Sequence, residues 1–343
     1  GNARWMLVMP DGTVFLTRRE EGDVIALVDA DGDGVADDPQ VSVVASDLPF
    51  VHGIAFNGSY LYLVTDTTVY QAEWLGGAQI GQLFPIITDL PTGGQHPNRT
   101  LGFAPDGSLF ITVGSTCNAC RESDPENATI LRAQPDGSMR EIYATGLRNT
   151  IGFGWHPLTG ELWGMDHGSD WRGNEQPPEE LNMIMQGQNY GWPWCYADRQ
   201  PDLFIPVPPP GGLGRLGYCQ LTAPPALTYT AHSAPLGMVF YTGTQFPSEY
   251  SNDAFVAMRG SWNRNPPSGY EVVHIDFDEA GQPVSITPFI TGWLLGDGRT
   301  NFGRIAGLAL AADGSLLIAE DQNGIIYRVS YTGGETPTAT ATP

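Results

Sequence analysis

The chain has 343 residues, including 43 glycines and 28 prolines, and only 16% of its residues are charged. This composition predicts a turn-rich, mostly β protein, because so many glycines and prolines interrupt helices yet stay below the level of a disordered chain. The formal net charge is −22 and every basic residue is an arginine, which excludes lysine chemistry and argues against nucleic-acid or anionic-membrane partners, since both require a positive surface.

No apolar run reaches the length of a membrane helix, so we expect no membrane insertion. The chain also begins without an initiator methionine or a signal-like segment, so we interpret it as a mature or trimmed sequence.

One pattern recurs six times: a polar residue, an apolar run with an early small residue, a turn, and a second apolar run. The six copies open at Arg4, His52, Arg99, Arg148, His232 and Arg304. The first four copies begin 47 to 49 residues apart, and the last two intervals are 84 and 72 residues. A period of this length with short strands predicts an all-β, six-bladed β-propeller of four-stranded antiparallel blades.

The two long intervals predict loop insertions between blades, at about residues 164–231 and 259–301. The only helix that the sequence suggests is short and lies within residues 177–187, where prolines and acids precede an apolar stretch and a glycine follows it. We assign the propeller to residues 1–332. Residues 333–343 are rich in threonine and proline and are predicted to be a linker to a further part of the protein.

The four cysteines form two local pairs, Cys117 with Cys120 and Cys195 with Cys219. A Cys-x-x-Cys motif can be half of a zinc site or a redox motif, but those need a second nearby pair or a βαβ setting. Neither is visible, so we favour two structural disulfides. Disulfides persist in oxidising compartments, which predicts a periplasmic or secreted protein.

In a propeller the first strand of each blade lines the central channel, so the residue that opens each repeat should lie near the channel mouth. Four of these six residues are arginines, which indicates a bound anion with several carboxylates or phosphates. The alternative is that each arginine pairs with acids of a neighbouring blade. His96 lies in a glycine-rich loop and is either a general base or a hydrogen-bonded structural histidine.

An acidic segment in the first repeat matches the first half of an EF-hand loop through Asp29, Asp31, Asp33 and Asp37. The twelfth position is Gln40, where a bidentate glutamate belongs. The segment fits a structural Ca²⁺ site and fits a solvated acidic hairpin equally well.

Several motifs follow one another in a characteristic order. They are Gly-Gly-Gln-His-Pro-Asn-Arg-Thr-Leu-Gly-Phe (93–103), Gly-Leu-Arg-Asn-Thr-Ile-Gly-Phe (146–153), Met-Asp-His-Gly-Ser-Asp (165–170), Gly-Gln-Asn-Tyr-Gly-Trp-Pro (187–193), His-Ser-Ala-Pro (232–235) and Arg-Gly-Ser-Trp-Asn-Arg (259–264). Together they resemble the soluble quinoprotein sugar dehydrogenases. This is the aldose, glucose and sorbosone dehydrogenase group, which binds pyrroloquinoline quinone (PQQ) on a six-bladed propeller.

The resemblance implies that His96 is the general base that removes a hydroxyl proton while hydride passes from the same carbon to the quinone. It implies that Arg148 and Asn149 contact the quinone oxygens and stabilise charge on the reduced ring. Arg259 and Arg304 are implied to hold the quinone carboxylates.

The same resemblance adds Arg264 and His232 to the cofactor-binding residues. It implies a Ca²⁺ ion held by the main-chain carbonyls of Gly168 and Ser169, with Asp170 nearby. The implied activity is oxidation of a sugar, a related polyol or an aldehyde hydrate. Electrons would pass to an external acceptor such as a cytochrome domain or protein.

Three departures from the family pattern bear on this interpretation. Gln95 stands where glucose-oxidising relatives have an acid, which leaves the sugar preference open. Arg259 stands where some relatives have lysine. The chain begins at what resembles the second strand of the family's opening segment, so a truncated first strand and a weaker ring closure are expected. The alternatives are a Ca²⁺-dependent lactonase or esterase propeller and a secreted, non-enzymatic binding module.

Overall fold

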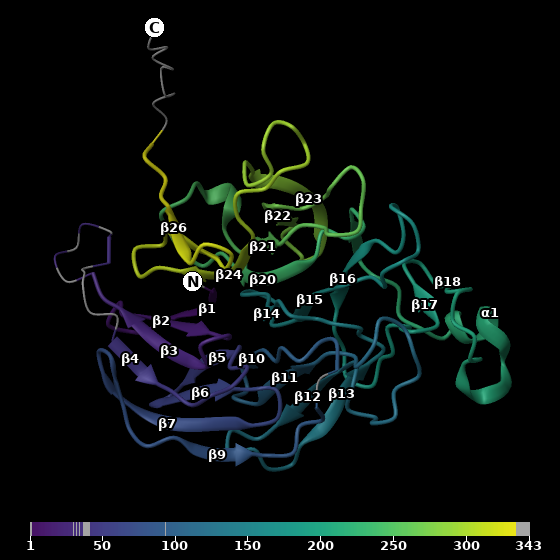
Figure 1. The fold of residues 1–343 in the computed structure, drawn as a ribbon, viewed down its shortest axis with the longest axis horizontal. Coiled ribbons are helices and arrows are strands. Elements are labelled where there is room, and N and C mark those ends of the chain that lie inside the picture. Colours follow the sequence, from purple (N-terminus) through teal and green to yellow (C-terminus); the bar gives the residue numbers. More distant parts are fainter. Residues whose placement is uncertain are drawn as a thin grey trace, which may run out of the picture.

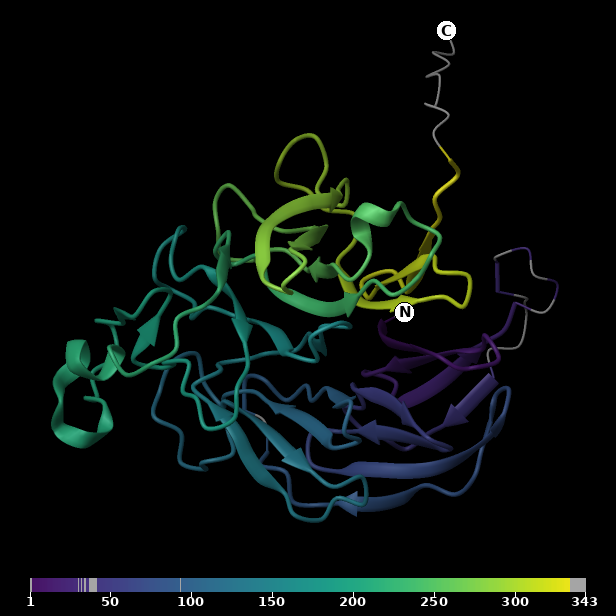
Figure 2. The same cartoon turned by 180° about the vertical axis from the view of Figure 1, so that it is seen from behind.

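The computed structural model describes residues 2–29, 31, 33, 35, 36, 42–92 and 94–333. Within these residues the strands form six large antiparallel sheets that surround a central axis (Figure 1). The same ring of sheets is visible from the opposite side (Figure 2). The predicted six-bladed β-propeller is therefore confirmed.

The strands of each sheet follow one another in the chain, and the first strand lies nearest the axis (Figure 1). The first sheet contains β1 (Ala3–Val8), β2 (Val14–Arg18), β3 (Asp23–Leu27) and β4 (Ser42–Ala45). The second contains β5 (Ile54–Asn57), β6 (Tyr60–Val64), β7 (Val69–Gly76), β8 (Gln79–Ile80) and β9 (Phe84–Ile87). The third contains β10 (Leu101–Phe103), β11 (Leu109–Val113), β12 (Thr129–Ala133) and β13 (Glu141–Thr145).

The remaining three sheets complete the ring. The fourth contains β14 (Phe153–Trp155), β15 (Leu162–Asp166), β16 (Glu179–Met183) and β19 (Leu227–Tyr229). The fifth contains β20 (Pro235–Phe240), β21 (Ala254–Met258), β22 (Glu271–Phe277) and β23 (Pro283–Ile290). In the described chain the sixth has three strands where four were predicted, and these are β24 (Ile305–Leu310), β25 (Leu316–Glu320) and β26 (Ile325–Val329).

The early glycine of several repeats is required by the close approach of the innermost strands. A Cβ atom on Gly152, just before β14, would lie 2.1 Å from the carbonyl oxygen of Leu236 in β20. A Cβ atom on Gly307 in β24 would lie 2.6 Å from the carbonyl oxygen of Arg4 in β1. Both distances are far below the van der Waals separation of about 3.5 Å. Neighbouring blades therefore meet backbone to backbone at the axis.

The hydrophobic core is divided into clusters that lie between neighbouring sheets. Between the sixth and first sheets, Met6 and Leu16 pack against Ala309 and Leu317. Strands between two such clusters are buried on both faces, which explains why their apolar runs are continuous instead of alternating. The ring closes through the same kind of contact that joins the other blades.

The helix predicted within residues 177–187 is wrong, because the centre of this segment forms β16, the third strand of the fourth sheet. Acids after prolines often mark the start of a helix. Here the Glu179 carboxylate is buried and accepts hydrogen bonds from the backbone N–H groups of Gly168 and Ala234, both at 2.9 Å. The α-helix of the described chain, α1 (Gly214–Cys219), lies where none was predicted.

The first predicted insertion, residues 164–231, is too long, because it includes β16 and β19 of the fourth sheet. The inserted segment lies between these two strands, and therefore within the fourth sheet and not between blades. It carries α1 and a small sheet of β17 (Cys195–Tyr196) and β18 (Gln200–Pro201), and it projects from the side of the ring (Figure 1). The second predicted insertion, residues 259–301, contains β22 and β23 of the fifth sheet itself. Among the described residues, no helix has the length and apolarity needed to cross a membrane.

Both predicted disulfides are confirmed. Cys117 pairs with Cys120, and Cys195 in β17 pairs with Cys219 at the end of α1. The second disulfide joins two cysteines of the inserted segment that are 24 residues apart in the chain. The first closes a short loop that follows β11.

Candidate active site

The residues that open the six repeats precede or begin the innermost strands. Their contacts divide them into three pairs, which are His52 with Arg99, Arg148 with His232, and Arg4 with Arg304. The first pair bonds to the backbone, whereas the other two pairs surround the carboxylates of Asp170 and Asp321.

Arg99 is fully buried and acts on the loop that carries His96. Its guanidinium donates to the carbonyl oxygens of Pro91 at 2.7 Å, His96 at 2.8 Å and Asp66 at 3.2 Å. The Arg99 carbonyl oxygen in turn lies 3.0 Å from Nδ1 of His52. Each guanidinium nitrogen of Arg99 thus makes a hydrogen bond to the protein, and the side chain is fully buried, which indicates a structural role beneath the channel mouth.

His96 has one ring nitrogen fixed and the other available. Its Nδ1 lies 3.0 Å from the Ser115 carbonyl oxygen and 2.9 Å from Ser115 Oγ, which itself donates to the Cys117 carbonyl at 2.8 Å. A carbonyl oxygen only accepts, so Nδ1 carries the proton and Nε2 keeps its lone pair. Burial, together with the nearby charge of Arg148, lowers the pKa of His96 to about 3. The imidazole is a neutral base at ordinary pH.

Arg148 is 3% exposed and is held by two residues. Its Nε donates to the Asn118 carbonyl oxygen at 2.9 Å, and its Nη2 donates to Asn118 Oδ1 at 3.0 Å and to Asp170 Oδ2 at 2.9 Å. Nη1 has no hydrogen-bond partner among the described residues. One edge of the guanidinium is thus fixed, and its remaining nitrogen is free for a ligand.

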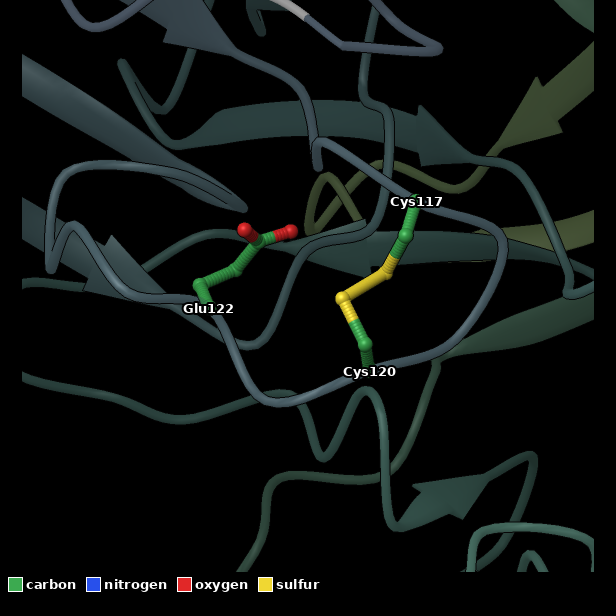
Figure 3. A group of neighbouring side chains, drawn as sticks. All are labelled: Cys117, Cys120 and Glu122. Atoms are coloured by element: carbon green, nitrogen blue, oxygen red, sulfur yellow. A yellow bond between two sulfur atoms is a disulfide. The ribbon is translucent and has the colours of Figure 1, made fainter.

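Asn118 follows Cys117 in the chain and lies within the short loop that the Cys117–Cys120 disulfide closes. Figure 3 shows this disulfide with Glu122 nearby. Glu122, in the same loop, accepts hydrogen bonds from the backbone N–H of Thr116 at 2.7 Å and from its hydroxyl at 2.6 Å. The disulfide and these hydrogen bonds fix the loop that presents Asn118. From the sequence, the cysteines were used to infer two disulfides and an oxidising compartment, and Asn118 was missed. A polar amide inside so short a disulfide loop could have indicated a residue held in a fixed position.

The backbone of Arg148 and Asn149 is anchored by Asp166 at the end of β15. The Asp166 carboxylate accepts the N–H of Arg148 at 2.9 Å, the N–H of Asn149 at 2.8 Å and the hydroxyl of Thr150 at 2.8 Å. Burial raises the pKa of Asp166 to about 6 despite these bonds. The predicted Arg-Asn pair is therefore presented by a buried acid of the same blade.

Asn149 is paired with His167, a residue that sequence reasoning did not single out although it stands in the Met-Asp-His-Gly-Ser-Asp motif. Asn149 Nδ2 lies 3.3 Å from Nδ1 of His167, and His167 Nε2 donates to the carbonyl oxygen of Pro235. Burial lowers the pKa of His167 to about 4, so it is neutral. Asn149 Oδ1 is left as a buried acceptor with no partner in the described chain.

The predicted metal loop follows His167 directly. Within the described chain, no hydrogen bond ends on the carbonyl oxygens of Gly168 and Ser169. The carboxylate of Asp170 accepts hydrogen bonds from Arg148 and from Asn263 Nδ2, both at 2.9 Å. The two carbonyls are thus the available oxygens of the loop, and Asp170 joins it to Arg148.

His232 and Arg264 both support this region from the fifth blade. His232 Nε2 lies 2.8 Å from the Gly173 carbonyl oxygen, and its Nδ1 lies 4.0 Å from Asp170 Oδ1. Arg264 forms an ion pair with Glu175 at 3.0 Å. These contacts are all with other residues of the protein, so the predicted contact of His232 and Arg264 with a cofactor stays a prediction.

Arg4, Arg259, Arg304 and Asp321 form a cluster at the other side of the mouth, in which the Asp321 carboxylate contacts two of the three guanidinium groups. Asp321 Oδ2 contacts Arg4 Nη1 at 2.5 Å and also contacts Arg259 Nη1. Arg304 donates to the carbonyl oxygens of Arg259 and Gly260. Burial, with the charge of Arg259 nearby, lowers the pKa of Arg4 to about 10. The cluster has an excess of positive charge, in a protein whose net charge is −22.

The acidic segment of the first blade lies apart from these groups. Carboxylate oxygens of Asp29, Asp31 and Asp33 lie within 4.8 Å of one another, and these side chains could hold a metal ion. Asp37 lies outside the described residues. Ca²⁺ binding by this segment stays a prediction.

The fold and site together define a class of protein: a six-bladed propeller whose channel mouth presents a neutral histidine, buried arginines and free main-chain carbonyls. Comparison with known proteins agrees with this class. The sequence profile described as Glucose / Sorbosone dehydrogenase matches residues 2–328. The chain belongs to this family, which confirms the predicted resemblance.

Individual relatives show how far the similarity extends. An uncharacterized protein of Borreliella burgdorferi is 33% identical over 66% of this chain and 58% of its own length. A PQQ-dependent pyranose dehydrogenase of Coprinopsis cinerea is 31% identical over 42% of this chain and 23% of its own length. The chain thus spans less than two thirds of these relatives.

Solved structures agree on the fold. The calcium structure of a Trichoderma reesei enzyme of carbohydrate-active family AA12 has a TM-score of 0.80 at 22% identity, covering 95% of this chain and 92% of that one. The holo form of a Coprinopsis cinerea pyranose dehydrogenase PQQ domain has a TM-score of 0.78 at 20% identity, covering 96% and 92%.

Proposed function

We propose that the protein is a PQQ- and Ca²⁺-dependent dehydrogenase that oxidises a hydroxyl group of a sugar, a related polyol or an aldehyde hydrate. The observation that carries the proposal is the tautomer of His96. Its Nδ1–H is bonded to Ser115, its Nε2 lone pair has no hydrogen-bond partner among the described residues, and the positive charge of Arg148 helps to lower its pKa.

The donor set fits the cofactor. PQQ is a tricarboxylate, and Arg4, Arg259 and Arg304 bring three positive charges to one region, where the Asp321 carboxylate contacts two of them. The free Nη1 of Arg148 supplies a further donor.

The oxygens of the metal loop fit Ca²⁺. This ion prefers oxygen ligands, including backbone carbonyls. The carbonyls of Gly168 and Ser169 accept no hydrogen bond from the described residues. These two carbonyls would hold the ion, with Asp170 beside them.

When bound, PQQ supplies a hydride acceptor and Ca²⁺ a Lewis acid. His96 Nε2 accepts the proton of the substrate hydroxyl, and its Nδ1–H remains on the Ser115 carbonyl, which stabilises the imidazolium that forms. Arg148 holds a fixed positive charge where negative charge develops, and Asn149 is held beside it by Asp166. The buried surroundings strengthen these interactions because water screens them poorly.

Substrate turnover requires that the electrons leave to an external acceptor, which we propose is a small mediator or a cytochrome. We also propose a periplasmic or secreted location, supported by the two disulfides.

The test is titration of the apoprotein with PQQ in the presence of Ca²⁺, followed by visible absorbance, and then dye reduction with a panel of aldoses, polyols and aldehydes. We expect saturable quinone binding and sugar-dependent dye reduction, both lost with a chelator. Quinone binding without turnover of any panel member would favour a binding module. Hydrolysis of lactones without quinone binding would favour the lactonase alternative and reject the proposal.

A further inference from the structure

Two exposed tryptophans stand beside the candidate active site. Trp171 is 66% exposed and Trp262 is 63% exposed, and their ring centroids lie 5.1 Å apart with an interplanar angle of 81°. The two indoles therefore form a corner of two perpendicular walls, here called the aromatic corner. Large aromatic side chains usually bury most of their surface, so two exposed neighbours require an explanation.

The two loops that carry the aromatic corner are fixed to each other. Asn174 Nδ2 donates to the Asn265 carbonyl oxygen at 2.7 Å, and the Asn265 N–H donates to Asn174 Oδ1 at 3.2 Å. Arg264 crosses between the same loops, donating to the Asn174 carbonyl at 2.9 Å and pairing with Glu175. The corner is thus built from the fourth and fifth blades and is rigid before any ligand arrives.

Trp171 is held in a conformation that a bulky residue rarely adopts. Its φ angle is +65°, in the left-handed region. That conformation costs about 1 kcal/mol or more for a non-glycine residue and persists only where the surroundings impose it. The strain serves no core packing, because the indole points into solvent. An exposed, strained and rigidly held aromatic residue is typical of a binding surface.

The aromatic corner lies one residue away from the groups that hold Arg148. Asp170 precedes Trp171, Asn263 follows Trp262, and the Asn263 amide donates to the Asp170 carboxylate at 2.9 Å. Asp170 also contacts Arg148 at 2.9 Å. Asn263 Oδ1 is buried and has no hydrogen-bond partner within the described chain. The corner therefore stands at the rim of the site, beside an acceptor that lacks a donor.

We infer that the aromatic corner binds a sugar ring next to the one that is oxidised, so that the preferred substrates are oligosaccharides or glycosides with at least two rings. The C–H bonds of a pyranose face carry partial positive charge and are attracted to the negative face of an indole. The inference rests on the proposed function in one respect, namely which of the two sugar rings is oxidised.

A protein partner fits the corner less well. Stable protein interfaces bury roughly 800 Å² on each partner. The immediate neighbours of the two tryptophans are polar or charged, namely Asp170, Arg172, Ser261 and Asn263. The aromatic corner, with its two perpendicular indole rings, matches one face of a single sugar ring better than it matches a protein surface.

The first test measures binding in the absence of quinone. Glucose, maltose, maltotriose, cellobiose and cellotriose are titrated into the apoprotein and followed by saturation-transfer NMR and tryptophan fluorescence. We expect Trp171→Ala and Trp262→Ala each to weaken binding of the di- and trisaccharides by about tenfold, and to leave glucose nearly unchanged. Phe84→Ala is the matched control and should leave the binding of every sugar unchanged. It removes another exposed aromatic residue, in β9 of the second blade.

The second test uses the quinone-loaded enzyme. For the variants we expect a higher KM for disaccharides with kcat retained, an unchanged kcat/KM for monosaccharides, and partial rescue by Trp262→Phe. Equal effects on one-ring and two-ring sugars, or no effect, would overturn the inference. So would variants that change only the KM for a cytochrome acceptor, because the corner would then dock a protein.

The two tests separate this inference from the proposed function. If no quinone binds but disaccharide binding depends on the tryptophans, the proposed function fails and the aromatic corner stands. If sugars are oxidised with no dependence on either tryptophan, the corner fails and the function stands. Thermal unfolding of each variant excludes a loss of fold.

Discussion

Asn118 accepts two hydrogen bonds from one edge of the Arg148 guanidinium: its carbonyl oxygen lies 2.9 Å from Nε of the arginine, and its Oδ1 lies 3.0 Å from Nη2. The same Oδ1 accepts the backbone N–H of Asp170 at 2.7 Å, and Asn118 Nδ2 donates to the Asp170 carbonyl at 3.0 Å. One side chain thus positions both the arginine and the metal loop. We regard Asn118 as a positioning residue, since it need not touch substrate or cofactor.

Asn118→Ala is expected to weaken PQQ binding by about tenfold or more. The substitution leaves an N–H group of Arg148 and the N–H group of Asp170 without their acceptor, and each such loss costs about 1–3 kcal/mol. Absorbance titration with PQQ measures the change. Asn118→Asp keeps the Oδ1 acceptor and should restore most of the affinity. Equal affinity in the alanine variant and the native protein would show that Arg148 is positioned without Asn118.

The Cys117–Cys120 disulfide should matter for the site and the Cys195–Cys219 disulfide for stability alone. Replacing Cys117 and Cys120 by serine frees the loop that presents Asn118, so we expect several-fold weaker PQQ binding and a lower kcat. Replacing Cys195 and Cys219 should lower the free energy of unfolding by about 3 kcal/mol and leave kcat unchanged. Binding titrations and thermal unfolding of both double variants check this, and identical effects on kcat would contradict it.

The fold could be predicted because its constraints recur locally. Each innermost strand needs a small residue where blades meet, as Gly152 and Gly307 show, and each hairpin needs its turn, so the sequence repeats. The strand β16 was missed because its acids resemble a helix start. The Glu179 carboxylate of this strand can be buried because distant backbone N–H groups, such as that of Ala234, donate hydrogen bonds to it. No local sequence pattern reveals these donors.

The candidate site was predictable only in part, for a related reason. His96 and Arg148 stand at fixed places in the repeat and could be found by position. Asp321, the counter-ion of Arg4, is 317 residues away from it in the chain. Their ion pair forms because the ring of blades closes, and no local sequence pattern predicts it. Asn118 and His167 were missed because each acts through a neighbour that the topology supplies.

His96 should stay active as a base well into the acid range. Its pKa is lowered to about 3, first by burial and then by the charge of Arg148. A lowered histidine pKa means that the folded protein binds the proton more weakly than the unfolded chain does. The resulting stability is present above pH 6.5 and is lost as the pH falls toward 3.

Two measurements check the role of His96. The pH profile of kcat/KM should show no fall between pH 7 and pH 5 from this group. His96→Gln should lower kcat by about 10²- to 10⁴-fold and still bind PQQ with nearly native affinity. An acid limb near pH 6.5 that disappears in the glutamine variant would show instead that the histidine titrates normally.

Glu180 should make the fold less stable as the pH rises. Its side chain borders a cavity of about 20 Å³ together with Asp166 and Asp202, and its Oε1 accepts the Ala197 N–H at 2.5 Å. Burial raises the pKa of Glu180 to about 8. Its folded pKa thus lies above the ordinary value, so the folded state favours the protonated acid. Stability from this group is fully present below about pH 4.5 and is lost as the pH rises toward 8.

Glu180→Gln removes the titration and keeps an oxygen acceptor for the Ala197 N–H. The comparison uses chelator-treated protein. At pH 4.5 we expect the variant and the native protein to have the same free energy of unfolding. At pH 8 we expect the free energy of unfolding of the variant to be higher, by up to about 4 kcal/mol. Thermal unfolding at both pH values measures the difference, and Glu279→Gln, which changes an exposed acid, is the matched control. A shift of the same size at both pH values would mean that packing and not ionisation is responsible. No shift at pH 8 would mean that Glu180 ionises in the folded state without cost.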